Sequence, residues 1–195
     1  MKIIFLDHDG VICLSNNWGS RTKKWAKFRS ANPTSSRYMD EAPFEYRLDD
    51  FDKKSVKILN EILEETGAEI VVSSDWKFFV TLEELGQYYE LQGIIKKPIA
   101  FTPNLGECTW YDIWDWSSEW DLEMTRVIEI KQHLHDHPEI THWVSIDDLD
   151  MGKTGKKRDM EFEHDWGLEN FVLTPNQMEG IKQSNIKEKI KKFLK

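Results

Sequence analysis

Short apolar runs that end directly in acidic or hydroxyl residues recur along this chain, and they constrain its fold more than any other feature. A short, continuous run of apolar residues is typical of a strand buried on both faces of a parallel sheet. Segments with helical periodicity separate the runs, and this alternation favours a mostly parallel sheet. Three such runs cover 2–6, 70–72 and 143–146, and they lead into Asp7-His8-Asp9-Gly10, Ser73-Ser74-Asp75 and Asp147-Asp148.

Helix start and stop signals lie between the expected strands. Asp52 precedes a segment with apolar residues on one helical face, and Gly67 supplies its stop. Thr81 and Glu84 have the spacing of a capping box. The other expected elements are an extended stretch over 94–101, a helix over 124–134, a strand over 171–173, and a closing helix with Thr174 as its N-cap. These elements predict a Rossmann-like three-layer α/β sandwich with about five, mostly parallel strands.

Length and composition bound the class of protein. The 195 residues have room for one domain with a core of its own. Residues 15–50 lack periodicity and residues 104–123 are rich in Trp and acids, so we expect both as insertions of minimal cap size. No apolar run approaches the ~20 residues of a membrane span. The two cysteines, Cys13 and Cys108, favour a reducing compartment, so we expect a cytoplasmic protein with no membrane partner.

The charge balance excludes one function class. A net charge of −9 argues against a protein that coats nucleic acid, because such a protein would be basic overall. A local basic groove remains compatible with this balance. An acidic chain also suits a protein that gathers carboxylates around a divalent cation.

The acidic residues should meet at one edge of the sheet, because the carboxyl ends of parallel strands lie together there. Asp7 and Asp9 can take separate roles: one can attack the substrate or bind a metal ion, while the other transfers protons. Their alternative is a solvated turn. Asp147 and Asp148 repel each other unless a cation compensates, and Mg²⁺ fits such a site. Their alternative is an acidic helix N-terminus.

A hydroxyl group follows the second run. Ser73 stands where that strand ends and can donate to a phosphoryl oxygen, with Ser74 as a close rival for the same role. The alternative for either residue is an ordinary helix N-cap.

These residues, in this order, resemble the motifs of the haloacid dehalogenase (HAD) superfamily of phosphohydrolases. The first motif reads Phe5-Leu6-Asp7-His8-Asp9-Gly10-Val11, the second Val71-Val72-Ser73 and the fourth Val144-Ser145-Ile146-Asp147-Asp148. The third is a basic residue that Arg126, Lys131 or Lys77 can supply, although the family usually has Lys. The finer pattern, Val-Val-Ser-Ser-Asp-Trp-Lys followed by Thr102-Pro103, resembles the branch associated with Swiss Army knife RNA-repair proteins.

The resemblance implies a phosphatase mechanism. Asp7 would attack phosphorus to form an aspartyl-phosphate, and Asp9 would serve as acid and then as base. Mg²⁺ would be held by Asp7, by the backbone carbonyl of Asp9, and by Asp147 or Asp148. Ser73 and Arg126 would hold the transferring oxygens, with Ser74, Lys77 and Lys131 as further substrate-binding candidates.

The expected substrate is the phosphate of a nucleotide or of an RNA or DNA end, because caps this small leave an open site. A small-metabolite phosphatase and a non-catalytic HAD-like binding module are the alternatives. Five basic residues interleaved with Trp25 and Phe28 fit a nucleic-acid backbone, but we favour packing of these aromatics on the core. We likewise favour packing over a lid for the Trp-rich stretch. The five are Arg21, Lys23, Lys24, Lys27 and Arg29.

Overall fold

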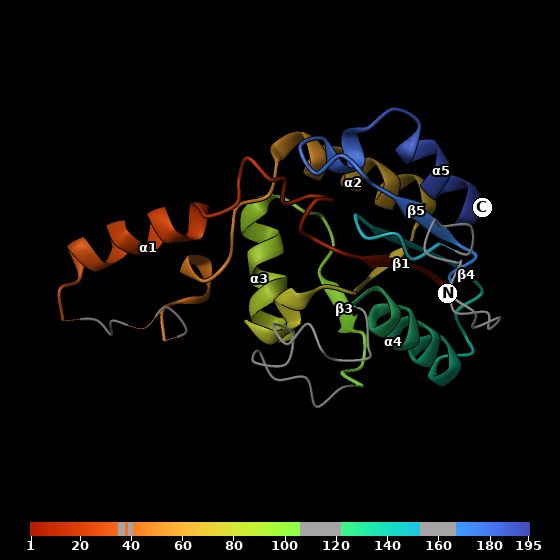
Figure 1. Ribbon diagram of the computed structural model, residues 1–195, viewed down its shortest axis with the longest axis horizontal. Helices are drawn as coiled ribbons and strands as arrows, with labels where there is room; N and C mark the ends of the chain where they lie inside the picture. The colour runs from red at the N-terminus through yellow and green to blue at the C-terminus, as the bar shows by residue number, and fades with distance from the viewer. Residues whose placement is uncertain (35–37, 39–40, 106–121, 153–166) are drawn as a thin grey trace.

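The computed structural model describes residues 1–34, 38, 41–105, 122–152 and 167–195. A five-stranded sheet runs through its centre, with all strand pairs parallel and the order β3-β2-β1-β4-β5 (Figure 1). This confirms the α/β class and the number of strands expected. The strands are β1 (Lys2–Leu6), β2 (Glu69–Val72), β3 (Pro98–Phe101), β4 (His142–Asp147) and β5 (Phe171–Leu173).

The three central strands end level with one another. Leu6, at the end of β1, pairs with Val72 of β2 and with Ile146 of β4. The next peptide groups continue the ladder: the amide of Asp7 donates to the Ile146 carbonyl at 3.1 Å, and that of Ser73 donates to the Leu6 carbonyl at 3.0 Å. The polar residues that follow these three strands therefore lie at the same edge of the sheet, as the motifs predict.

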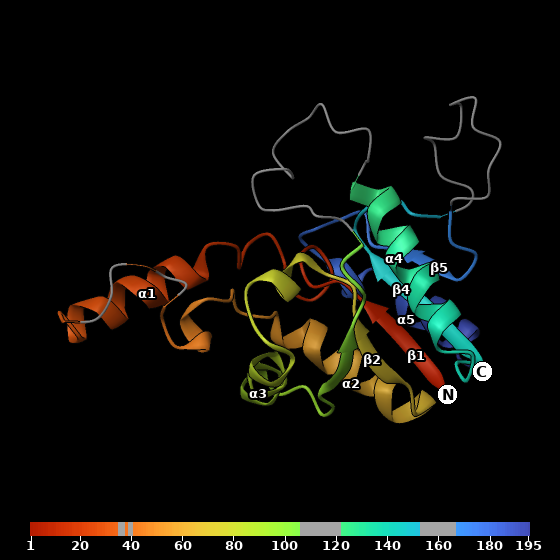
Figure 2. The same ribbon diagram turned by 90° about the horizontal axis from the view of Figure 1, so that it is seen from below.

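Helices cover both faces of the sheet (Figure 2). Side chains alternate along each strand, so Ile4 and Leu6 of β1 join the larger apolar cluster while Ile3 and Phe5 join the smaller one. The larger cluster takes residues from α2 (Lys53–Thr66), α3 (Leu82–Gln92) and α5 (Ile186–Phe193). The smaller takes residues from α4 (Leu122–Asp136).

Local helix signals act as expected at α2 and α3. Asp52 accepts hydrogen bonds from the amides of Lys54 and Ser55, and Gly67 ends α2 with a left-handed φ of 71°. Thr81 and Glu84 form both hydrogen bonds of the capping box that opens α3.

The start of the closing helix differs from the expectation. Thr174 is no N-cap: α5 begins at Ile186, after a 3₁₀ turn, η4 (Gly180–Lys182). The Thr174 hydroxyl donates instead to the carbonyls of Asp147 at 3.2 Å and Gly10 at 3.3 Å. Because its hydroxyl bonds to carbonyls at the ends of other segments, it does not cap a helix.

The segment expected as an insertion forms α1 (Ser20–Ala31) and the 3₁₀ turn η1 (Phe44–Tyr46). In Figure 1, α1 projects from the carboxyl edge of the sheet, away from the body. Trp25 is buried, stacks on Phe28 at 5.7 Å between ring centroids, and Phe28 lies 4.5 Å from the Tyr46 ring. The aromatics of α1 thus pack, although on one another and η1 rather than on the central sheet.

Most of the Trp-rich stretch falls in 106–121, outside the described residues, so its packing stays a prediction. Among the helices that are described, none has the length and apolar character needed to cross a membrane.

Candidate active site

Three carboxylates gather at the carboxyl ends of β1 and β4. Asp7, Asp147 and Asp148 each offer one oxygen, and these atoms lie within 4.8 Å of one another. Asp7 and Asp147 are buried, while Asp148 is half-buried. The convergence expected from the motifs is therefore present, and a set of carboxylate oxygens is the donor chemistry that a hard divalent cation prefers.

Arg126, on the first turns of α4, reaches this acidic group. Its Nη1 lies 2.7 Å from Asp147 Oδ2 and 3.2 Å from Asp7 Oδ1, and its Nη2 lies 3.2 Å from Asp75 Oδ1. The side chain is only 8% exposed. A buried guanidinium between buried carboxylates compensates charge that would otherwise oppose folding.

The other two basic candidates lie elsewhere. The Lys77 ammonium is 2.6 Å from Glu129 Oε2 in a buried ion pair, and 3.4 Å from the Thr102 hydroxyl. Lys131 is exposed on α4. Of the three, Arg126 is the residue that the structure brings to Asp7.

Burial dominates the protonation equilibria of the acidic group. It raises the pKa of Asp7 well above its usual value and that of Asp147 to about 6, while Arg126 offsets part of both shifts. Burial alone would lower the pKa of Arg126, but Asp147, Asp7 and Asp75 raise it well above its usual value. Additional positive charge beside Asp7 and Asp147 would therefore favour their ionised forms.

The two serines after β2 have different surroundings. The Ser74 hydroxyl accepts a hydrogen bond from the Trp76 amide at 3.5 Å and caps the 3₁₀ turn η2 (Asp75–Phe78). Ser73 is 1% exposed, and its hydroxyl has no hydrogen-bond partner among the described residues. An unsatisfied buried hydroxyl at a strand end is available to a ligand.

The turn η2 supports the site through three consecutive side chains. Asp75 pairs with Arg126, the Trp76 indole donates to Asp9 Oδ2 at 2.9 Å, and Lys77 pairs with Glu129 of α4. Sequence reasoning missed the partners of Asp75 and Trp76, and it noted Glu129 in the pattern Arg126-x-x-Glu129-Ile130 without predicting its pairing with Lys77. The signal for the first two was present, because Asp-Trp-Lys directly follows a motif strand.

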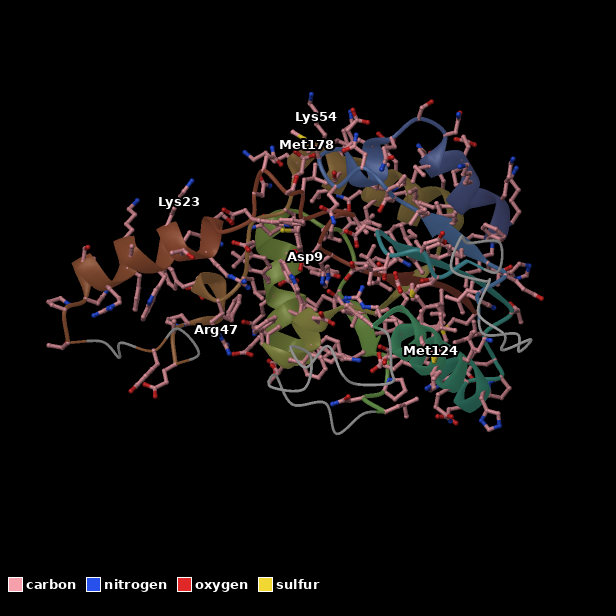
Figure 3. All side chains as sticks on the ribbon, viewed as in Figure 1. Asp9, Lys23, Arg47, Lys54, Met124 and Met178 are labelled. Carbon is pink, nitrogen blue, oxygen red and sulfur yellow. The ribbon has the colours of Figure 1, made fainter. Side chains whose placement is uncertain are left out.

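Asp9 is set apart from the three-carboxylate group. It is half-buried, and Figure 3 shows it between the sheet and α1. Burial raises the pKa of Asp9, while hydrogen bonds from the Trp76 indole and the Cys13 thiol, and the charge of Arg21, oppose that shift. A half-exposed carboxyl whose pKa is raised is suited to exchange a proton with a bound molecule.

The backbone after Asp9 leaves no space for a side chain. Gly10 has a φ of +69°, and a Cβ there would clash with the carboxylate of Asp148. Asp148 Oδ2 also accepts a hydrogen bond from the Gln177 amide at 2.6 Å. Gly10 therefore makes the turn possible and leaves room for one of the three acids.

A five-stranded parallel sheet with these acids at its carboxyl edge is consistent with a HAD domain. The family described as the HAD domain in Swiss Army Knife RNA repair proteins matches residues 3–186, and the chain belongs to that family. This confirms both the superfamily and the branch expected from the motifs. No curated protein and no solved structure matches the sequence. Membership indicates a hydrolase of the phosphatase type, and the acidic group fits metal binding.

Proposed function

We propose that this protein is a Mg²⁺-dependent phosphomonoester hydrolase with Asp7 as its nucleophile. The observation that carries the proposal is the meeting of Asp7, Asp147 and Asp148 beside a buried serine hydroxyl that has no partner among the described residues. Such a site offers a nucleophile, ligands for a cation and a donor to a phosphoryl oxygen at one edge of the sheet.

The residues present fit a divalent cation. Oxygens of Asp7, Asp147 and Asp148 would hold it. Asp7 Oδ1 lies 3.2 Å from Arg126 Nη1 but accepts no hydrogen bond from the described residues. A bound divalent cation would offset the repulsion between an anionic nucleophile and an anionic substrate. The backbone carbonyl of Asp9 remains a proposed ligand through the family resemblance alone.

The chain's own residues account for the remaining chemistry. Asp7 forms a bond to phosphorus, the bond to the leaving oxygen breaks, and Asp9 gives that oxygen its proton. Asp9 then takes a proton from the water that attacks phosphorus, and the phosphoryl group leaves Asp7. Ser73 and Arg126 hold the transferring oxygens, because Ser74 is engaged in a cap, Lys77 is paired with Glu129 and Lys131 is exposed.

Phosphate release tests this activity. The substrates run from p-nitrophenyl phosphate and mononucleotides to 3′- and 5′-phosphorylated oligonucleotides, each with Mg²⁺ or with EDTA. We expect metal-dependent release that is fastest from oligonucleotide ends. A preference for small phosphate esters would favour the metabolite-phosphatase alternative, and no release from any substrate would favour a non-catalytic binding module.

The preference for a nucleic-acid end rests on α1. Its twelve residues hold five basic side chains and no acid, in a chain of net charge −9. Arg21 and Lys24 pair with Asp49 and Asp50, at 3.6 and 2.7 Å, and so fix the base of the helix to the body. Lys23 and Lys27 are exposed and make no ion pair within the described part of the chain.

The position of α1 agrees with such a substrate. Arg21 is close enough to Asp9 to lower its pKa, so the base of α1 lies on the side of the site where the proton donor stands. A leaving group departs toward the acid that protonates it. The remainder of a nucleic-acid strand would then pass near the exposed lysines, which can contact its phosphates. Because Trp25 and Phe28 pack on each other, α1 would contact the backbone rather than stack bases.

The salt dependence of oligonucleotide binding tests this role. We expect the Lys23→Gln/Lys27→Gln variant to weaken binding and to reduce the slope of log K against log salt by about 0.7 for each phosphate that the helix no longer neutralises. The matched control is Lys189→Gln/Lys192→Gln, which removes two exposed lysines from α5. Equal slopes for the two variants would exclude α1 as the strand-binding element, without affecting the hydrolase proposal.

A further inference from the structure

The side chain of Trp76 is fixed in place by burial and by contacts with two other rings. It is 2% exposed, and its ring stacks on Phe51 at 5.2 Å with an angle of 17° between the planes. The His8 ring lies 4.6 Å away on the larger apolar face of the sheet. Rings packed in this way fix the direction in which the indole N–H points.

That N–H points at Asp9. The indole nitrogen donates to Asp9 Oδ2 at 2.9 Å, and the same turn that carries Trp76 is capped by Ser74. Asp9 is half-buried, and the Cys13 thiol is a second hydrogen-bond donor to its carboxyl group. A hydrogen bond from a fixed donor removes rotational freedom from the carboxyl group.

We propose that Trp76 is a positioning residue for proton transfer, because its indole holds Oδ2 of Asp9 and so fixes the direction in which the carboxyl presents its proton to the leaving oxygen. The inference rests on the proposed function. Atoms balance as in that mechanism: the phosphorus–oxygen bond of the substrate breaks, its oxygen takes the proton from Asp9, and Asp7 carries the phosphoryl group. Trp76 itself neither gains nor loses an atom.

The role of Trp76 predicts a dependence on the leaving group. An alkoxide, such as the sugar oxygen of a phosphorylated oligonucleotide, needs protonation as it departs, whereas p-nitrophenolate is stable without it. Misplacing Asp9 should therefore slow alkyl esters selectively. The parameter to compare is kcat/KM, because it covers the steps up to departure of the first product.

The experiment uses Trp76→Phe, which keeps an aromatic ring against Phe51 and removes the N–H. We expect kcat/KM to fall about 10- to 100-fold for a phosphorylated oligonucleotide or an alkyl phosphate, and less than about threefold for p-nitrophenyl phosphate. Trp143→Phe is the matched control, since that indole lies on β4 against Phe5 at 5.9 Å, and both ratios should stay near wild type.

A second variant covers the case in which Trp76→Phe does not fold. Phe51→Leu keeps the indole N–H but loosens the ring that stacks on it, so it should show the same selectivity for alkyl esters with a smaller loss. Equal losses for both kinds of ester in these variants would overturn the positioning role and leave the hydrolase proposal standing. A wild-type protein that hydrolyses neither ester would overturn both.

Discussion

Among single residues, Gly10 has the least freedom to change. Its positive φ of +69° disfavours any side chain, and its missing Cβ leaves the space that the Asp148 carboxyl fills. A substitution there acts directly on the proposed cation site, because Asp148 belongs to the three-carboxylate group. The glycine of the first motif is thus required by a contact between two motifs that are far apart in the sequence.

Gly10→Ala should weaken Mg²⁺ binding about 10- to 100-fold, because the new methyl group displaces Asp148. Isothermal titration calorimetry measures this affinity. Gly67→Ala is a matched control: its φ of +71° imposes the same backbone strain, but nothing lies within 4 Å of the added Cβ. If both variants bind Mg²⁺ as the wild type does, Asp148 has no part in the cation site.

At the scale of elements, η2 and α4 are joined by a buried ion pair. Lys77 and Glu129 are 7% and 5% exposed at the side chain, and the Thr102 hydroxyl donates to the same Glu129 oxygen at 3.1 Å. Arg126 stands one turn before Glu129 on α4, so this pair also fixes the helix face that presents Arg126 to Asp7.

Lys77→Met should lower the free energy of unfolding by about 3–5 kcal/mol, because it leaves the Glu129 carboxylate buried without a counter-charge. The double variant Lys77→Met/Glu129→Met should recover most of that loss. Chemical denaturation of the two single variants and the double variant measures the coupling. Additive losses would mean that the two side chains do not depend on each other.

How far the sequence predicts this molecule depends on whether a signal is local. The strand runs, the Asp52 and Gly67 caps and the Thr81 capping box are set by neighbouring residues, and the structure has all of them. Thr174 carried an equally good local signal for a helix start, but contacts with Gly10 and Asp147 engage its hydroxyl.

In the site too, some features follow from the sequence pattern and others depend on tertiary packing. The convergence of Asp7, Asp147 and Ser73 follows from parallel strands that end level, so pattern alone predicts it. The partners of Arg126 and Trp76 depend on how η2 and α4 pack, which no spacing in the sequence encodes. Ser73 and Ser74 are likewise equivalent in the sequence and differ only because one caps η2.

At the scale of the whole molecule, the first motif is built over a buried aromatic cluster. His8 is fully buried, and its Nε2 shares a 2.6 Å hydrogen bond with the Tyr89 hydroxyl. Its ring lies beside Phe51 and Trp76. Burial, with a smaller contribution from Arg126, lowers the pKa of His8 to about 3. Between about pH 3 and 6.5 the His8 imidazole is therefore neutral in the folded protein, whereas it is protonated in the unfolded chain.

This difference makes stability depend on pH with a defined sign. The unfolded chain binds one more proton than the folded one between about pH 6.5 and 3, so stability falls as pH falls through that window. His8 alone contributes a slope of up to about 1.4 kcal/mol per pH unit. His8→Gln should show a flatter decline by chemical denaturation, whereas His142→Gln, at an exposed site, should match the wild type.

The central claim is that Asp7 carries the phosphoryl group during turnover, and trapping that group tests it most directly. The protein is mixed with Mg²⁺ and a phosphorylated oligonucleotide, quenched in acid within the first turnover, and digested for mass spectrometry. We predict that the peptide containing Asp7 gains the mass of one phosphoryl group, that EDTA prevents the gain, and that Asp7→Asn folds but shows neither the gain nor phosphate release. Full release by Asp7→Asn, or a phosphoryl group on another residue, would contradict the account.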